Sequence, residues 1–177
     1  SLGTLLAGGA NAAKASPWLL RLAAVNDMQG IDIRTAMATA KSLYTLNSRN
    51  EILSDIKVRE AIMRGIDREQ LAAIRFQGLG YTEDLPGSFN LFQTQDGYED
   101  NFGEVVQYDP EKAKELLKAS GYNGTPVLMM QPTDLTILST QPIVAAERLR
   151  EAGFTVLCYT PRQLIDHPTR FLTDLIS

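Results

Sequence analysis

The sequence predicts an α/β fold in which a mixed sheet is flanked by helices. Short apolar runs such as "TPVLMMQP" and "FTVLCY" have the length and composition of buried strands. Amphipathic segments that carry residues typical of helix starts and helix ends alternate with these apolar runs along the chain. The composition of the 177 residues, 44% hydrophobic and 21% charged, is ordinary for a globular protein that buries one core. We therefore expect residues 1–177 to form a single α/β lobe.

The strand predictions rest on apolar alternation and on continuous apolar runs. Ile31 and Ile33 alternate with charged residues, which is the period of a half-buried strand. The segment "KSLYTLNS" is partly apolar on both sides, which predicts a central strand. The resulting set of predicted strands is 30–36, 41–47, 125–131 and 154–159.

The clearest helix is "YDPEKAKELLKASGY". Asp109 can accept hydrogen bonds from the first turn, and Pro110 fits the first helical position. Gly121 can adopt the left-handed conformation that ends a helix. The same kind of pattern predicts further helices that start at Ser54 or Asp55, near Asp67, before Ile143 and at Thr160 and Pro161, the one before Ile143 ending at Gly153.

Two features depart from regular helix patterning. Gly65 interrupts a helical pattern at a cost of about 1 kcal/mol relative to alanine, which predicts a joint or a close backbone approach. Residues 77–107 are rich in glycine and have little periodicity, yet they carry aromatic residues such as Phe89, Phe92 and Phe102. A disordered segment would not carry this apolar area, so we expect a long ordered loop.

Charge, hydropathy and cysteine content exclude several classes of protein. The net charge is −4 and no basic run exists, so we expect no nucleic-acid partner. No stretch approaches the roughly 20 apolar residues of a membrane span, and the start of the sequence lacks the basic region of a signal peptide. The single cysteine, Cys158, excludes an internal disulfide and does not fix the compartment.

The residues offer little catalytic chemistry. His167 is the only histidine, which makes a zinc site improbable, and we interpret it as exposed and idle. Cys158 lies in an apolar strand where a thiol is inert. The acidic residues around Glu99 lack the regular spacing of calcium ligands and are interpreted as solvated surface. We therefore expect no enzyme activity, no metal and no cofactor.

Three segments of the sequence follow one another in a characteristic order. They are "LYTLNSRNEILSDIKVREAIMRGIDREQL", "YDPEKAKELLKASGY" and "IVAAERLREAGFTV". The ordered set resembles the second lobe of family 5 extracellular solute-binding proteins, the oligopeptide- and dipeptide-binding receptors of ABC importers. The matching positions, from Leu5 to Tyr159 overall, are Asp55, Val58 to Ile62, Ile66 to Glu69, Tyr108 to Pro110, Gly121, Tyr122 and Gly153.

Three departures from the family pattern stand beside this resemblance. Gly9 to Asn11 replace residues that are usually Gly-Glu-x-Asp-like, and the approach to Asp55 lacks its usual prolines. The match ends after Tyr159. "LIDHPTRFL" can be aligned with a later aspartate–proline ligand loop of the family, but a helix that starts at Thr160 is simpler and preferred.

The resemblance implies one lobe of a two-lobed periplasmic-binding-protein-like fold of the cluster C type. Its implied partners are a peptide or small solute, an ABC transporter permease and the first lobe of the parent protein. It also implies a periplasmic or extracellular location, with a lipoprotein anchor as one form of attachment. A homodimer of the isolated chain is a further expectation, because a missing lobe would leave apolar surface exposed.

Ligand contacts are expected on loops at the edge of the sheet. The best candidates are Gln131, Pro132, Thr133 and Asp134, which follow the "VLMM" strand, where the family places ligand contacts. Asp134 is either a partner for a ligand's ammonium group or the N-cap of the next helix. Tyr44 and Asn47 are weaker candidates near the end of their predicted strand.

Two alternatives belong to other functional classes. One is a ligand-sensing lobe inside a regulatory protein, which an adjoining DNA-binding domain would reveal. The other is an unrecognised enzyme, for which a strongly perturbed pair of carboxylates in a cleft would be the sign.

Overall fold

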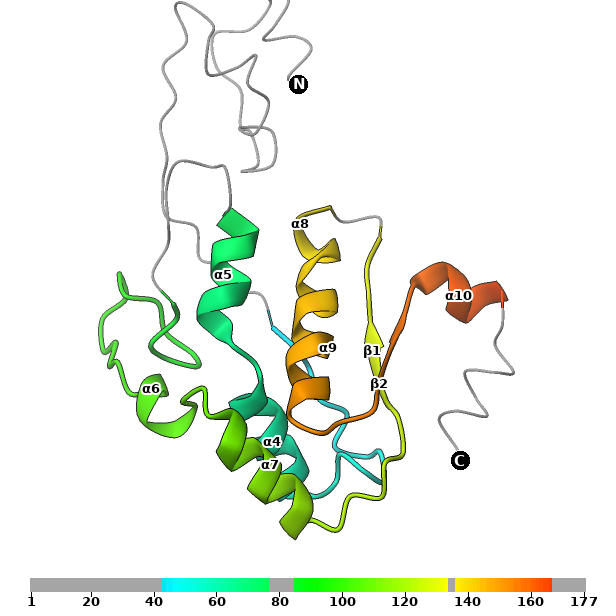
Figure 1. The fold of residues 1–177 in the computed structure, drawn as a ribbon. Helices are drawn as coiled ribbons and strands as arrows, with labels where there is room; N and C mark the ends of the chain where they lie inside the picture. Colours follow the sequence, from blue (N-terminus) through cyan, green and yellow to red (C-terminus); the bar gives the residue numbers. More distant parts are fainter. Residues whose placement is uncertain (1–42, 77–84, 134–135, 167–177) are drawn as a thin grey trace, which may run out of the picture.

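The computed structural model describes residues 43–76, 85–133 and 136–166, and Figure 1 shows their arrangement. The described helices are α4 (Ile56–Gly65), α5 (Arg68–Phe76), α6 (Phe102–Val105), α7 (Pro110–Ala119), α8 (Thr136–Ser139), α9 (Gln141–Glu151) and α10 (Pro161–Asp166). The strands are β1 (Val127–Met130) and β2 (Val156–Tyr159). The mixture of helices and strands confirms the predicted α/β class.

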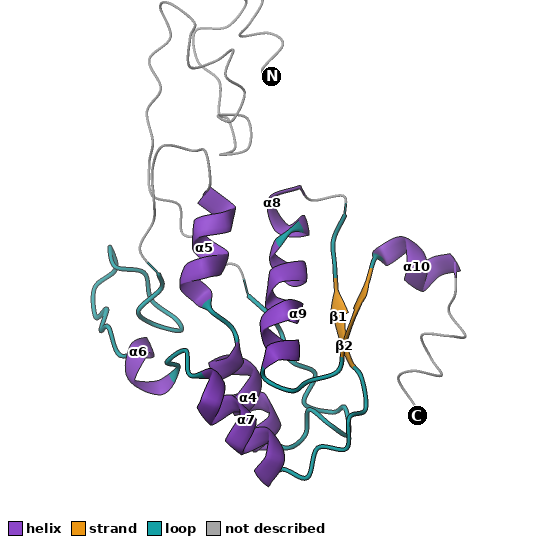
Figure 2. Cartoon of the chain, viewed as in Figure 1, coloured by secondary structure: helices purple, strands orange, loops and turns teal. Residues whose placement is uncertain are grey.

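The strands β1 and β2 pair in parallel, with Val127 opposite Val156 and Met130 opposite Tyr159. Helix α9 lies between them in sequence and packs against both, so the three elements form a βαβ unit (Figure 2). The predicted strands at 125–131 and 154–159 are thereby confirmed.

The other two predicted strands have different outcomes. Residues 43–47, the described part of the segment at 41–47, belong to no strand, so that prediction is wrong there. Apolar alternation describes which side chains can be buried, whereas a strand also needs a neighbour in hydrogen-bonding register. The predicted strand at 30–36 lies outside the described residues.

Helices α4 and α7 pack side by side in antiparallel directions, tied together at both ends. The N–H of Asp109, at the start of α7, donates to the carbonyl of Arg64 in the last turn of α4 (2.9 Å). At the other end, Lys57 Nζ donates to the carbonyl of Ala119 (3.2 Å). The helix of "YDPEKAKELLKASGY" is therefore scaffold in this lobe.

The predicted helix ends are confirmed by their hydrogen bonds. Asp55 Oδ1 accepts from the Lys57 N–H (2.7 Å) at the start of α4, and Asp109 Oδ1 accepts from the Lys112 N–H (2.8 Å) at the start of α7. Gly121 and Gly153 end α7 and α9 with positive φ angles of 74° and 100°.

Small residues allow the helices to approach closely in the core. A Cβ atom at Gly65 would lie 3.2 Å from Leu149 Cδ2 and 3.4 Å from the Cβ of Ala152, so the predicted close approach at this glycine is confirmed. Ala113 and Ala145 are fully buried nearby. The remaining buried residues of the core are Val58, Ala61, Ile62, Ile66, Leu71, Leu117, Val127, Ala146, Leu149, Ala152, Phe154 and Val156.

Two positions on apolar elements are more exposed than their patterns predict. Ile143 is an apolar residue of α9 but is 45% exposed, because Ala145, Ala146 and Leu149 form the buried face of the helix. Leu157 is 37% exposed because the outer face of β2 carries no covering helix among the described residues.

The described part of the long loop, residues 85–107, contains the short helix α6 and contacts of its own. The carbonyl of Gly87 accepts from the N–H groups of Asn101 (3.0 Å) and Phe102 (2.8 Å). The centre of the Phe102 ring lies 4.2 Å from the centre of the Phe89 ring. The Arg68 guanidinium of α5 also lies 4.2 Å from the centre of the Phe102 ring. That all of 77–107 forms one ordered loop stays a prediction, because 77–84 lie outside the described residues.

Gly65→Val tests the close approach of the helices. We expect it to lower the free energy of unfolding by about 1–3 kcal/mol, because the branched side chain must displace Leu149 and Ala152. Urea denaturation followed by circular dichroism measures the change. The control Ala73→Val, on the exposed face of α5, is expected to cost about 0.5 kcal/mol. Equal effects for the two variants would contradict the packing argument.

Candidate functional site

The parallel strands end side by side, and their carboxyl ends form one edge of the lobe. The Gln131 N–H donates to the Tyr159 carbonyl (2.7 Å), which extends the pairing one residue past β1. Beyond this bond, β1 leads to α8 and β2 leads to α10 at the same end of the sheet (Figure 2). Ligands of open α/β sheets bind outside the carboxyl ends of the strands, so this strand-end edge is the first candidate site.

The predicted ligand residues after β1 lie at this edge, but their side chains differ in how accessible they are to a ligand. Gln131 Nε2 donates to the Ser139 carbonyl (3.2 Å), which ties the strand end to α8. Pro132 is half-buried and Thr133 is exposed. Asp134, the fourth predicted residue, lies outside the described residues. Thr133 is therefore the described member of the set whose side chain is most accessible to a ligand.

The start of α10 borders the same edge. Thr160 Oγ1 accepts from the Gln163 N–H (3.2 Å), and Gln163 Oε1 accepts from the Thr160 N–H (2.8 Å). This reciprocal pair is a capping box, which fixes how the chain leaves β2. The predicted helix start at Thr160 and Pro161 is confirmed, and His167 lies outside the described residues.

Tyr44 lies in the segment before α4 and is 40% exposed. Burial of its hydroxyl raises the pKa of Tyr44 to about 12, and the Cys158 thiol adds to the rise. The Tyr44 phenol is therefore close enough to Cys158 of β2 for the two groups to interact electrostatically, whereas Gln131 to Thr133 follow β1.

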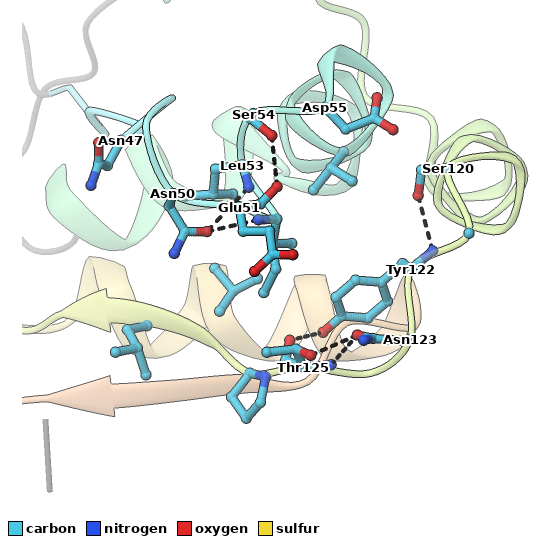
Figure 3. Close-up of a pocket in the computed structure, with 16 residues that line it drawn as sticks. Asn47, Asn50, Glu51, Leu53, Ser54, Asp55, Ser120, Tyr122, Asn123 and Thr125 are labelled. Carbon is cyan, nitrogen blue, oxygen red and sulfur yellow. Dashed lines mark hydrogen bonds between the residues drawn. The ribbon is translucent and has the colours of Figure 1, made fainter. Parts of the chain in front are cut away.

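A hollow of about 570 Å³ lies at the opposite end of β1 (Figure 3). Its walls come from the turn before α4, the turn after α7 and the first half of β1. The lining residues are Asn47, Asn50 to Asp55, Val58, Ser120 to Asn123 and Thr125 to Leu128. Asn47 is the one predicted ligand residue among them. Three residue steps along a strand, from Leu128 at the end of the lining to Gln131, correspond to about 10 Å, so the hollow and the strand-end edge are separate places.

The polar groups of the hollow are largely committed to local turns. Asn50 Oδ1 accepts from the N–H groups of Ile52 (3.1 Å) and Leu53 (3.2 Å), and Asn47 Oδ1 accepts from the Arg49 N–H (3.1 Å). The Tyr122 hydroxyl donates to the Thr125 carbonyl (2.6 Å). These bonds shape the walls of the hollow.

Sequence reasoning did not find the hollow. The sequence feature related to the hollow is a set of asparagines in its walls. Asn47, Asn50 and Asn123 each accept a hydrogen bond from the backbone N–H two residues later. This is the Asx-turn habit of asparagine. The habit predicts turns, but it does not predict that two turns from distant segments face the same strand.

The described residues supply no arrangement typical of catalysis. Among residues 43–76, 85–133 and 136–166, no three metal-binding side chains gather. Within the same ranges, no helix combines the length and hydropathy that crossing a bilayer requires. The thiol of Cys158 is half-buried on a strand. What the geometry offers is an edge of backbone and small polar groups, which suits binding.

Comparison with known proteins adds a family to this geometry. Residues 2–158 match the family described as bacterial extracellular solute-binding proteins, family 5 Middle. The oligopeptide-binding protein OppA of Mycobacterium tuberculosis is 42% identical over 96 residues, which are 53% of this chain and 16% of that protein.

Two further relatives come from other bacteria. The probable peptide ABC transporter periplasmic-binding protein y4tO of Sinorhizobium fredii is 28% identical over 134 residues, covering 76% of this chain and 23% of the relative. The dipeptide-binding protein of Escherichia coli is 36% identical over 76 residues, covering 42% and 13%. The chain thus spans less than a quarter of the length of each of these relatives.

Two tyrosines allow a test of the hollow's wall by the same substitution. The Tyr122 hydroxyl donates to the Thr125 carbonyl and accepts from the Thr155 N–H (3.1 Å), whereas the buried Tyr98 hydroxyl finds no hydrogen-bond partner among the described residues. We expect Tyr122→Phe to lower the free energy of unfolding by about 1–2 kcal/mol and Tyr98→Phe to leave it unchanged or raise it. Urea denaturation measures both. A larger loss in Tyr98→Phe than in Tyr122→Phe would refute this account.

The position of Tyr44 predicts a pH dependence at high pH. Since the folded pKa of about 12 exceeds the ordinary value of 10.0, the folded state holds the proton more tightly than the unfolded state. The stabilisation is present below pH 10 and is lost as the pH rises towards 12. We expect the free energy of unfolding of the wild type relative to Tyr44→Phe to be constant from pH 8 to 9 and to fall above pH 10. Denaturation midpoints across this range measure it, and a constant difference at all pH values would disprove burial of the hydroxyl.

Proposed function

The chain belongs to family 5 of the bacterial extracellular solute-binding proteins, and from this premise we propose that it binds peptides or similar solutes for an ABC importer. The observation that carries the proposal is the family match over residues 2–158, within which lie segments shared with oligopeptide- and dipeptide-binding relatives. A receptor that only binds its solute needs no enzyme activity, so the proposed role includes none.

In this proposal the ligand contacts the strand-end edge. Thr133 is exposed there, and Gln131 and Pro132 shape the backbone next to it. An extended peptide can hydrogen-bond to backbone groups at such an edge with little dependence on its side chains. Asp134 and the weaker candidates Tyr44 and Asn47 remain proposals, and Asn47 lines the hollow at the other end of β1.

The partners follow from the same role. The chain would act as the second lobe of a two-lobed receptor, closing on the ligand together with a first lobe and delivering it to a permease. Its location would be periplasmic or extracellular, with a lipoprotein anchor as one means of attachment. The relatives' greater length supports the need for a further lobe.

Thr133→Arg in the full-length receptor tests the strand-end edge. We expect a rise in Kd of at least about 10-fold for peptides, because a long charged side chain would occupy the proposed contact surface. Isothermal titration with mixed di- to pentapeptides measures the affinity. The matched control Thr155→Arg, also exposed but at the other end of the paired strands, is expected to leave the Kd unchanged.

The 177-residue chain alone belongs in the same titration. One lobe offers only part of the contact area, while association still costs about 4–15 kcal/mol. We therefore expect weak peptide binding or none. Sub-micromolar peptide binding by this chain alone would contradict the two-lobed proposal. Equal peptide affinities for Thr133→Arg and Thr155→Arg would contradict the assignment of the ligand to the strand-end edge.

A further inference from the structure

The dipeptide Asn123–Gly124 lies in the turn between α7 and β1, where both residues are exposed. Asn123 Oδ1 accepts hydrogen bonds from the Thr125 N–H (3.0 Å) and from Thr125 Oγ1 (2.6 Å), as Figure 3 shows. A backbone N–H can only donate, so the side-chain atom that it meets is the amide oxygen and not the amide nitrogen. Both donors of Thr125 therefore converge on the side-chain carbonyl of Asn123.

This arrangement activates the Asn123 carbonyl towards a nucleophile. Donors at a carbonyl oxygen stabilise the negative charge that forms there when the carbon is attacked. The backbone nitrogen of Gly124 is the next nucleophile along the chain, and its attack on Asn123 Cγ closes a succinimide ring. Gly124 has a φ of 88°, and the space that a Cβ would occupy there is open. No side chain hinders ring closure, and solvent can remove the proton of the Gly124 N–H.

We infer that Asn123 is a site of spontaneous deamidation, promoted by the hydrogen bonds from Thr125. The Gly124 nitrogen loses its proton to solvent and forms a bond to Asn123 Cγ, while Oδ1 carries the negative charge of the intermediate. The bond between Cγ and Nδ2 then breaks, and Nδ2 takes up a proton and leaves as ammonia. Water opens the succinimide at either of its carbonyls, which leaves aspartate or isoaspartate at position 123.

The products would change the wall of the hollow. Aspartate adds a negative charge to the turn. Isoaspartate directs the main chain through the side-chain carbons, which inserts a methylene group before Gly124. The Tyr122 hydroxyl bonds across this turn to the Thr125 carbonyl (2.6 Å) and accepts from the Thr155 N–H (3.1 Å). A lengthened turn would disturb these bonds, so the modification loosens the connection between α7 and the paired strands.

Two other asparagines of the hollow serve as internal controls. Asn50 Oδ1 also accepts from two backbone N–H groups, but Glu51 follows it, and a side chain at that position hinders ring closure. Asn47 Oδ1 accepts from a backbone N–H and is followed by Ser48. Trypsin places the three asparagines on separate peptides, because arginine and lysine residues lie between them.

Incubation of the full-length receptor at mildly alkaline pH, followed by peptide mass spectrometry, tests the inference. We expect deamidation at Asn123 to be at least about 10-fold faster than at Asn47 or Asn50. Thr125→Val removes the Oγ1 donor but keeps the backbone N–H and the size of the side chain. We expect this variant to slow deamidation about 3- to 10-fold, which corresponds to the loss of one hydrogen bond. Thr45→Val, at an exposed position outside the turn, is the matched control and is expected to leave the rate unchanged.

Two results would overturn the inference. Deamidation that is as fast or faster in Thr125→Val would show that the hydrogen bonds do not promote the attack. Equal rates at Asn123 and Asn50 in the wild type would show that the turn gives the glycine no advantage. The second comparison needs no variant, so it decides the matter even if Thr125→Val fails to fold.

Discussion

The close packing of α4, α7 and α9 around small residues is the constraint on which the rest of this lobe depends. Gly65 has no side chain to hold the neighbouring helix away, and Ala113, Ala145 and Ala152 add only a methyl group each. Helix backbones at this separation gain many weak dispersion contacts, which are large only in sum. The same closeness leaves little room for larger side chains, so the relative positions of the three helices are strongly determined.

The position of the sheet follows from the position of α9. The helix ends at Glu151 with Ala152 as its C-cap, and Gly153, with a φ of 100°, turns the chain towards β2. Arg150 in its last turn donates to the carbonyl of Val156 (2.7 Å), which anchors the start of the strand to the helix. Because β2 pairs in register with β1, the helix packing also determines where both strands end. The proposed ligand edge is therefore positioned by contacts on the other side of the lobe.

The features that the sequence predicted are those decided within a few residues. The caps at Asp55 and Asp109 form between near neighbours, and so does the turn at Gly121. The segment at 43–47 differs, because a strand requires a partner that its own residues do not encode. The same holds for Gln131, whose side chain binds the Ser139 carbonyl eight residues away and is thereby drawn from the ligand edge into the scaffold. The candidate ligand residues were predicted from their position after a strand. Whether their side chains are free to contact a ligand depends on tertiary contacts.

The proposed ligand edge is held in place before any ligand arrives. The Gln131 N–H bonds to the Tyr159 carbonyl and the Gln131 side chain bonds to the Ser139 carbonyl, so the backbone that leads to Thr133 is fixed on both sides. A binding surface that is fixed in advance loses little conformational entropy when it binds, so more of the interaction energy appears as affinity.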